Sequence, residues 1–151
     1  MDVVVVGDGP AGLSAALFLA KNGLEVVVLG EDRTDLHYAY LYNYLGVKEI
    51  HGDDLARMGR EQAASFGADL QEGHVTMVRR SDEGFHVETE DGRGYDAKYV
   101  VMASGADTRM LRDLGAQIER NIVQVDRDGR TTVENLYAAG RITRRIKIQA
   151  V

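Results

Sequence analysis

The feature that most constrains this chain is its first turn, a Gly-x-Gly-x-x-Gly set formed by Gly7, Gly9 and Gly12. Four consecutive valines, Val3 to Val6, precede the turn, and an Ala/Leu-rich segment with apolar residues on helical spacing follows it. This order predicts a strand, a tight turn and a helix. Gly7 permits the turn, Gly9 lets the backbone approach a pyrophosphate, and Gly12 lets the helix lie against the strand.

The predicted helix begins at Pro10, followed by Ala11. Proline suits this position, because the first helical turn has no use for its missing N–H. The remaining free N–H groups and the helix dipole then face the turn and form an anion site. The alternative interpretation is an ordinary strand-to-helix turn that contains three glycines.

A second strand predicts the other half of a βαβ unit. Gly23 ends the helix, and Glu25 to Leu29 is an apolar run typical of a parallel strand that is buried on both faces. Such a unit usually carries an acid at the end of this strand, where it accepts hydrogen bonds from the adenosine ribose. Here Gly30 comes first and Glu31 follows it. Glu31 is the candidate for the ribose, and a solvated loop carboxylate is the alternative.

A tyrosine-rich segment follows. Tyrosine recurs at every second position from Tyr38 to Tyr44, which predicts an extended stretch with one aromatic face, with a short helix as the alternative. One interpretation is aromatic packing beneath a long connection. The other is a wall beside a planar ligand, or a subunit interface.

The segment from Asp53 to Phe66 predicts a surface helix with one buried stripe, in which Met58 and Phe66 belong to the core. Asp53 and Asp54 are predicted to cap the helix and to match its dipole. Residues 67–70 then predict the end of the helix and a short third strand.

Residues 74–97 show alternating polarity around two glycine-centred turns and predict an antiparallel β-meander in place of a helical crossover. His74, at its start, is interpreted as an ordinary rim or surface histidine. The run Tyr99 to Met102 predicts a buried strand that ends in Ala103, Ser104 and Gly105, where small residues permit close approach to a ligand.

A short helix over residues 108–114 and strands over 122–125 and 136–139 complete the prediction. The fold class is therefore α/β, with a central parallel sheet and a meander crossover, in a single domain over residues 1–151.

Composition narrows the classes of partner. The net charge of -6 argues against nucleic acid or an anionic membrane as the main partner, although Arg141, Arg144, Arg145 and Lys147 form a local basic cluster. The sequence contains no cysteine, which excludes a thiolate metal site or a Cys-x-x-Cys pair within it. No apolar run approaches the roughly 20 residues of a membrane span, and we expect a cytoplasmic protein.

Together these segments resemble a known family. The first turn and helix, NYLG (residues 43–46), REQAASFGADL (60–70), VVMASGA (100–106) and NLYAAG (135–140) occur in the order found in the FAD domain of thioredoxin-reductase-like flavoproteins. The sequence is most similar to short, single-domain members that lack the separate pyridine-nucleotide domain.

The resemblance implies a Rossmann-like domain with FAD in an extended pose. Residues from the first two strand ends would hold the adenosine diphosphate part. These are Gly7, Gly9, Pro10, Ala11 and Gly12 at the pyrophosphate, Gly30, Glu31 and Asp32 at the ribose, and backbone near Val75 at the adenine.

The resemblance also implies residues nearer the flavin. Asn43 matches the asparagine of the family's Asn-Tyr-Pro-Gly motif, with Leu45 in place of proline, and Ser104 and Gly105 match a segment that passes close to the cofactor. In the family an aspartate follows the glycine equivalent to Gly140, whereas this sequence has Arg141. The cation could meet the diphosphate with a different hydrogen-bond pattern. The helix that follows in the family is not expected within these 151 residues.

Three functions fit the sequence. The first is an FAD-dependent oxidoreductase in which the flavin carries the chemistry and NAD(P)H or a redox partner protein supplies electrons. The second is a non-catalytic flavin-binding module that docks on a partner, and the third is an NAD-binding protein. No catalytic residue is assigned and no metal is expected. The tyrosine-rich face makes a homodimer a reasonable expectation.

Overall fold

The fold is built on a parallel sheet whose strands follow the predicted apolar runs. The computed structural model describes residues 1–146, so Lys147 of the basic cluster lies outside the described residues. Within these described residues the sheet has five strands, all parallel. In spatial order they are β12 (Leu136–Ala138), β9 (Tyr99–Met102), β1 (Val3–Val6), β2 (Val26–Gly30) and β5 (Asp69–Glu72).

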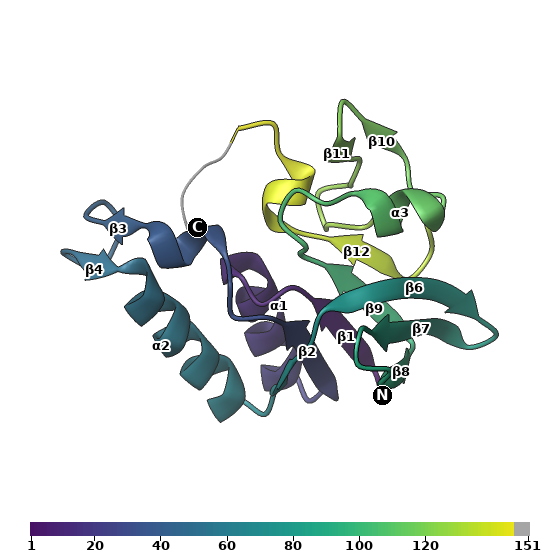
Figure 1. Ribbon diagram of the computed structural model, residues 1–151, viewed down its shortest axis with the longest axis horizontal. Helices are drawn as coiled ribbons and strands as arrows, with labels where there is room; N and C mark the ends of the chain where they lie inside the picture. The colour runs from purple at the N-terminus through teal and green to yellow at the C-terminus, as the bar shows by residue number, and fades with distance from the viewer. Residues whose placement is uncertain (147–151) are drawn as a thin grey trace.

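Alternate residues of each central strand enter two separate cores, one on each face of the sheet. Val3 and Val5 of β1 pack with α1 (Pro10–Lys21) and with Ala63 of α2 (Gly52–Ser65). Val4 and Val6 face the opposite core. Figure 1 shows both helices together on one side of the sheet. Burial on both faces explains why these strands are valine-rich rather than alternating in polarity.

The predicted meander covers the other face of the sheet. It consists of β6 (Val75–Ser81), β7 (Gly84–Thr89) and β8 (Gly94–Ala97), paired antiparallel in chain order. It lies between β5 and β9 in sequence, where a helix would otherwise make the crossover. Its Phe85 and Val87 are fully buried in the same core as Val4, which confirms the predicted fold class.

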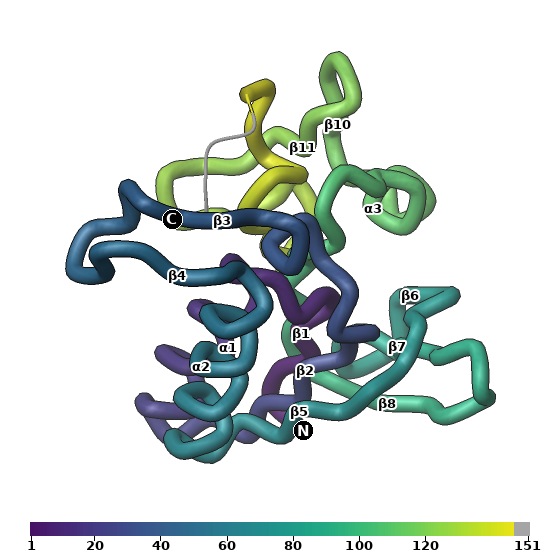
Figure 2. The backbone as a smooth tube through the Cα atoms, turned by 60° about the vertical axis from the view of Figure 1, so that its left-hand side comes forward, coloured from purple at the N-terminus to yellow at the C-terminus, as the bar shows by residue number. Residues whose placement is uncertain are grey.

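Shorter elements complete the chain. The segment between β2 and α2 contains the 3-10 helix η1 (Asp35–Tyr38) and the strands β3 (Tyr40–Leu41) and β4 (Ile50–His51), which project at one end of the molecule (Figures 1 and 2). Beyond β9 come α3 (Arg109–Asp113), β10 (Ile118–Glu119), β11 (Ile122–Val123) and the 3-10 helix η2 (Gly140–Thr143). In residues 1–146, the helices are all too short or too polar to span a bilayer.

Three predictions for α2 are wrong. The N-cap is His51, and Asp53 and Asp54 lie within the first turn, where they still match the dipole. Met58 is 49% exposed and Phe66 is 42% exposed, so neither belongs to the core. The buried stripe consists instead of small residues, Gly52, Ala56 and Ala63, because α2 lies close against α1 and η1.

Two other predictions need correction. The strand predicted over 122–125 is shorter, and as β11 it pairs with β10 outside the central sheet. In the tyrosine segment, only Tyr40 and Leu41 form a strand, and Tyr38 belongs to η1. Tyr38 is 88% exposed and Tyr42 is 71% exposed, so these two rings do not pack beneath a connection.

Candidate functional site

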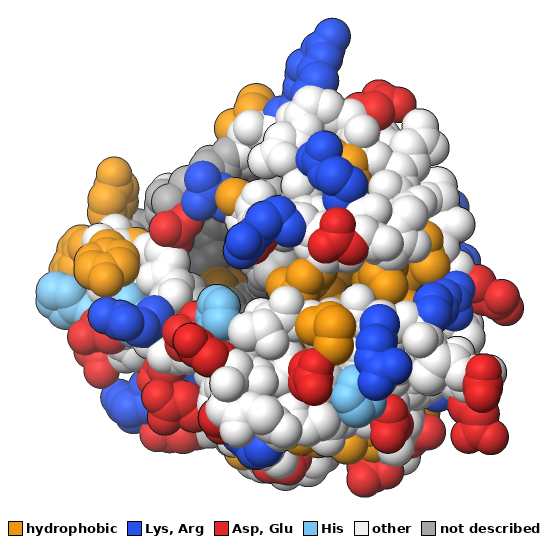
Figure 3. All heavy atoms as spheres, turned by 45° about the vertical axis from the view of Figure 1, so that its right-hand side comes forward, with side chains coloured by type: hydrophobic (Ala, Val, Ile, Leu, Met, Phe, Trp, Pro, Cys, Tyr) orange, Lys and Arg blue, Asp and Glu red, His pale blue; other side chains and the backbone are white. Residues whose placement is uncertain are grey.

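A cleft of about 860 Å³ lies at the carboxyl ends of β1, β2 and β9. The chain leaves β1 toward β2 on one side, and β9 pairs on the other side, so the cleft opens where the strand order switches direction. Open α/β sheets bind their ligands at this point. Figure 3 shows the molecule hollowed on one side, with basic and acidic side chains along the rim.

The three glycines of the first turn are required for different reasons. Gly7 has a φ of +106°, and a Cβ there would lie 2.4 Å from the carbonyl oxygen of Ala103. A Cβ on Gly12 would lie 1.9 Å from the carbonyl oxygen of Gly7. Gly9 has an ordinary φ of −73°, and a Cβ there would meet no atom closer than Thr34 Cγ2 at 3.6 Å. Packing therefore requires Gly7 and Gly12, whereas Gly9 leaves space open toward the cleft.

The N-terminus of α1 faces this space. Pro10 occupies the first helical turn, no side chain caps the helix at Gly9, and no acidic residue lies in its first turn. The first-turn N–H groups, such as that of Ala11, thus have no helical or side-chain partner among residues 1–146. Together with the helix dipole they can hold an anion.

A buried carboxylate lies beside the turn. Asp8, between the first two glycines, is only 6% exposed and lines the cleft. Its Oδ2 accepts hydrogen bonds from the N–H of Asp32 at 2.8 Å and from Arg60 Nη1 at 2.5 Å. Asp8 is not among the site residues predicted from the sequence. Two features of the sequence together could have indicated this residue: an acid within the first turn, and a glycine at the end of the second strand, where an acid is usual.

The two acids predicted for the ribose both lie in the loop after β2, but only one of them lines the cleft. Glu31 lines the cleft, and its Oε2 lies 2.9 Å from His74 Nδ1. This contact places His74 on the rim, in accordance with its interpretation. The Asp32 side chain is outside the cleft lining. It lies 3.2 Å from His37 Nε2 and 3.8 Å from Arg60 Nη1.

The loop after β9 forms the opposite wall. Gly105 has a φ of +67°, and Ser104 Oγ donates a hydrogen bond to the backbone oxygen of Asp107 at 3.0 Å. Hydrogen bonds from Arg109 lower the pKa of Asp107 and raise that of Arg109. An anionic and a cationic group therefore pair on this wall.

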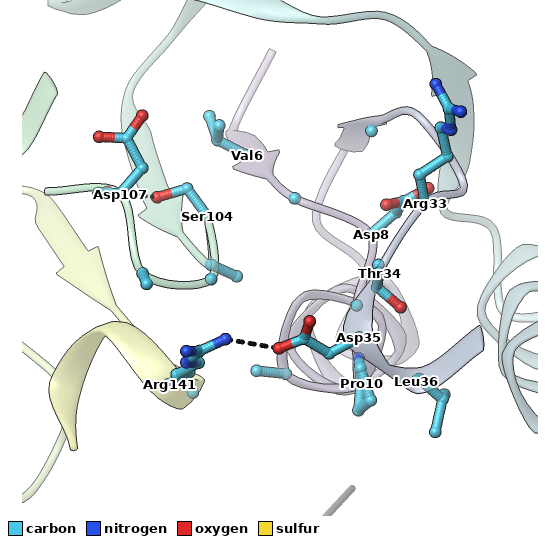
Figure 4. Close-up of a pocket in the computed structure, with 18 of the residues that line it drawn as sticks. Val6, Asp8, Pro10, Arg33, Thr34, Asp35, Leu36, Ser104, Asp107 and Arg141 are labelled. Carbon is cyan, nitrogen blue, oxygen red and sulfur yellow. Dashed lines mark hydrogen bonds and ion pairs between the residues drawn. The ribbon is translucent and has the colours of Figure 1, made fainter. Parts of the chain in front are cut away.

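The segment η2 closes one end of the cleft. Gly140 has a φ of +80°, and a Cβ there would lie 2.6 Å from Ala11 Cβ, so this glycine brings η2 against α1. Arg141 then forms an ion pair with Asp35 of η1 (Figure 4). The pair joins segments that are 106 residues apart in the sequence.

Most of the predicted site residues converge on this cleft. Twelve of them line it: Gly7, Gly9, Pro10, Ala11, Gly30, Glu31, Val75, Ala103, Ser104, Gly105, Gly140 and Arg141. Gly12 lies behind the turn as a packing residue. Asp32 is outside the lining, and Asn43 is exposed in the segment between β3 and β4, also outside it. Besides Asp8, the cleft contains Arg33, Thr34, Asp35 and Arg109, which sequence reasoning did not select.

The fold and the cleft define an α/β protein of the dinucleotide-binding class, with a meander crossover. The family model for pyridine nucleotide-disulphide oxidoreductases matches residues 1–71 and 47–150. The chain therefore belongs to the pyridine nucleotide-disulphide oxidoreductase family, which confirms the resemblance noted from its motifs.

Individual relatives agree with this assignment. The chain is 37% identical over 120 residues to a thioredoxin reductase of Aquifex aeolicus, covering 77% of this chain and 37% of the relative. It is 34% identical over 128 residues to a ferredoxin–NADP reductase of Thermus thermophilus, covering 79% and 38%. The chain thus spans a little over a third of the length of these curated relatives.

A solved structure supports the fold. The atypical thioredoxin reductase TRi from Desulfovibrio vulgaris Hildenborough superposes with a TM-score of 0.91 at 19% identity, covering 99% of this chain and 92% of the other. At this level of identity the likeness concerns the fold alone.

Proposed function

We propose that this chain binds FAD in the cleft and forms the FAD-binding part of a flavin-dependent oxidoreductase. The observation that carries the proposal is the space beside Gly9. The backbone of Gly9 would accept a side chain, and no protein atom would obstruct it. A glycine at the N-terminus of an uncapped helix, facing a cleft, suits a diphosphate group that must come close to the backbone.

The residues present fit the cofactor. N–H groups at the start of α1, around Gly9 and Ala11, would hold the diphosphate. Glu31 would lie on the rim beside the adenosine half and the backbone at Val75 near the adenine, with Arg141 as a further cation for the phosphates. The loop from Ala103 to Gly105 would pass close to the cofactor on the opposite wall. A volume of about 860 Å³ is within the usual range for cofactor sites.

When bound, the flavin would supply hydride and electron transfer, while the protein supplies binding and electrostatics. With no cysteine in the sequence, these 151 residues offer no dithiol to pass electrons on. The proposed electron donor is NAD(P)H or a redox partner protein. The exposed Tyr38, Tyr42 and Leu45 offer an apolar contact surface for such a partner or for a second copy of the chain. Sedimentation velocity tests the homodimer.

Calorimetric titration of flavin-free protein tests the proposal. FAD should bind at least tenfold more tightly than FMN, about 1.4 kcal/mol, because FMN lacks the adenosine diphosphate that the turn would hold. Binding of NAD⁺ without binding of FAD would contradict the proposal and support an NAD-binding protein.

A second measurement concerns catalysis. The bound flavin should bleach when NADH or NADPH is added without oxygen. A flavin that binds but stays oxidised with both donors would support the non-catalytic flavin module instead.

A further inference from the structure

We propose that Asp8 supplies the carboxylate that accepts hydrogen bonds from the adenosine ribose, in place of an acid at the end of β2, and that Arg60 positions it. This inference rests on the proposed binding of FAD and assigns one part of the ligand to one side chain.

The first argument is the space that the two positions share. A Cβ on Gly30, the last residue of β2, would lie 2.1 Å from Asp8 Cγ and 2.3 Å from Asp8 Oδ1. Gly30 is not among the glycines with positive φ, so its backbone would accept a side chain. The three atoms nearest to a Cβ at this position all belong to the Asp8 side chain, namely its Cβ, Cγ and Oδ1. The acid thus occupies the volume from which a residue at the end of β2 would reach the ribose.

The second argument is an acceptor without a donor. The Asp8 side chain is only 5% exposed. Among the residues that the structure describes, both groups that donate to it, the Asp32 N–H and Arg60, contact Oδ2, and none contacts Oδ1. Among the described residues no fully buried side-chain oxygen or nitrogen lacks a hydrogen bond, so Oδ1 is accessible from the cleft and not enclosed by protein. Because Asp8 lines the cleft, a ligand can supply the missing donor.

The chemistry of this acceptor selects the ligand group. A sugar hydroxyl donates a hydrogen bond to a carboxylate, whereas a phosphate has none to donate at neutral pH and is repelled by it. Asp8 also lies directly between Gly7 and Gly9, next to the place where the diphosphate would be held. The group one step away from that diphosphate in the adenosine half of FAD is the ribose.

Surrounding residues hold the carboxylate in place. Arg60 extends from α2 to Asp8, and its Nη1 also lies 3.8 Å from Asp32 Oδ1. Asp32 has a φ of +51°, a turn conformation that directs its N–H back to Asp8. Figure 4 shows the Asp8 side chain extending from the first turn toward the segment that carries Arg33. Arg60 is therefore a positioning residue, and Asp8 is the residue that would contact the ligand.

The test moves the acid from one position to the other. Asp8→Gly empties the space, and Gly30→Asp returns a carboxylate from β2. Glycine is needed at position 8, because even Asp8 Cβ lies 2.5 Å from a Cβ on residue 30. Calorimetry measures the dissociation constants of ADP, 2′-deoxy-ADP and 3′-deoxy-ADP for the wild-type protein, both single variants and the double variant. Thermal unfolding is followed in parallel, and the exposed Asp82→Gly serves as a control for loss of one carboxylate.

The wild-type protein and the Asp82→Gly control should bind ADP about tenfold or more tightly than at least one deoxy analogue, as expected for a hydrogen bond to a charged group. This ratio should fall to about one in Asp8→Gly and recover in the double variant. Gly30→Asp alone should lower affinity and stability, because both carboxylates then compete for one volume. In Arg60→Lys the ratio should be retained.

Other results would contradict the role of Asp8 or the binding of FAD. A ratio near one in the wild-type protein, or an unchanged ratio in Asp8→Gly, would overturn the role of Asp8 while leaving FAD binding intact. A purely structural Asp8 would lower the unfolding temperature without changing the ratio. Failure of the wild-type protein to bind either ADP or FAD would overturn the proposed function itself, and this inference with it.

Discussion

At the scale of single residues, two glycines of the first turn should have different roles: Gly12 in packing and Gly9 in binding of the cofactor. Gly12→Ala should lower the free energy of unfolding by about 1–3 kcal/mol or prevent folding, because its Cβ would lie 1.9 Å from the Gly7 carbonyl oxygen. Gly9→Ala should change stability by no more than about 1 kcal/mol, the cost of a poorer N-cap. The same variant should raise the dissociation constant of FAD at least tenfold.

Urea unfolding and FAD titration of both variants check this prediction. A Gly9→Ala protein that binds FAD as tightly as the wild type would show that the space beside Gly9 has no role in binding. A fully stable Gly12→Ala protein would show that the turn can relax away from α1.

The glycine pattern was readable from the sequence, but the role of Asp8 was not. Gly-x-Gly-x-x-Gly fixes the backbone and leaves the x positions undefined, so a carboxylate there carries no signal by itself. Its meaning depends on Gly30, 22 positions later in the sequence, and on a side-chain overlap that only the folded strands create. Gly30 is therefore recognisable from the sequence as a glycine where an acid is usual, but the side chain that fills its place is not.

At the scale of elements, α2 covers the sheet and also supplies Arg60, which pairs with Asp8 in the first turn. Arg60→Ala should lower the free energy of unfolding by about 2 kcal/mol or more, because it leaves the buried Asp8 carboxylate without its cation. Arg57→Ala, on the same helix, should cost less than about 1 kcal/mol, because its ion pairs with Asp54 and Glu61 are exposed.

Chemical denaturation of the two variants provides a matched comparison. Equal losses would mean that Asp8 does not depend on Arg60. Addition of FAD should widen the difference between the variants, because α2 would influence the cofactor only through Asp8.

The same helix shows why periodicity predicts a face only in part. The large apolar residues Met58 and Phe66 predict a core face through their positions, yet both are exposed. The observed contact face consists of Gly52, Ala56 and Ala63. A Cβ on Gly52 would lie 1.6 Å from the Leu36 carbonyl oxygen, so close packing selects the smallest residues. Hydrophobicity alone does not carry this information.

The turn between β7 and β8 makes part of the stability dependent on pH. A hydrogen bond from Arg93, and to a smaller extent one from Thr89, lowers the pKa of Asp91. The contribution of this carboxylate is fully present above its unfolded pKa, about 3.9, and is lost as the pH falls through the lower folded value. Asp91→Asn should therefore be less stable than the wild type at pH 7, and the difference should shrink steadily below about pH 4.

Thermal unfolding between pH 7 and pH 2.5 checks this expectation. Asp82→Asn, in the other turn of the meander, is the control, because Asp82 makes no hydrogen bond or ion pair within residues 1–146. A stability difference for Asp91→Asn that does not vary with pH would show that the loss is not electrostatic.

At the scale of the whole molecule, one ion pair spans the mouth of the cleft. Arg141 pairs with Asp35, and removal of either partner should affect FAD in opposite directions. Arg141→Ala should weaken FAD binding severalfold, because a cation near the diphosphate is lost. Asp35→Asn should strengthen it, because a negative charge is removed and Arg141 can turn toward the phosphates.

Titrations at low and high salt check the prediction, since added salt should reduce both effects. If both variants weaken FAD binding equally, the pair acts as a structural link and not through its charge.

The global arrangement was largely predictable, because the valine-rich strands and the alternating meander carry strong periodicities. The position of the last strands was not. Ile122 and Val123 read as one more strand of the sheet, but they form a separate hairpin with β10, since two-residue strands have too little pattern to indicate a partner. Asn43 was assigned by its motif, and its exposed position reflects the course of a segment with little regular structure.

The order in which the cleft is assembled has a consequence for biosynthesis. The glycine turn, α1 and β2 leave the ribosome early, whereas β12 and η2, which close the cleft, belong to residues 136–143. At about 5–20 residues per second, these last elements follow the first turn by several seconds or more. A nascent chain thus exposes the sheet edge beside β9 from the time β9 emerges until β12 follows it. If the cleft holds FAD as proposed, flavin loading would be a late event that is completed only after β12 docks against β9.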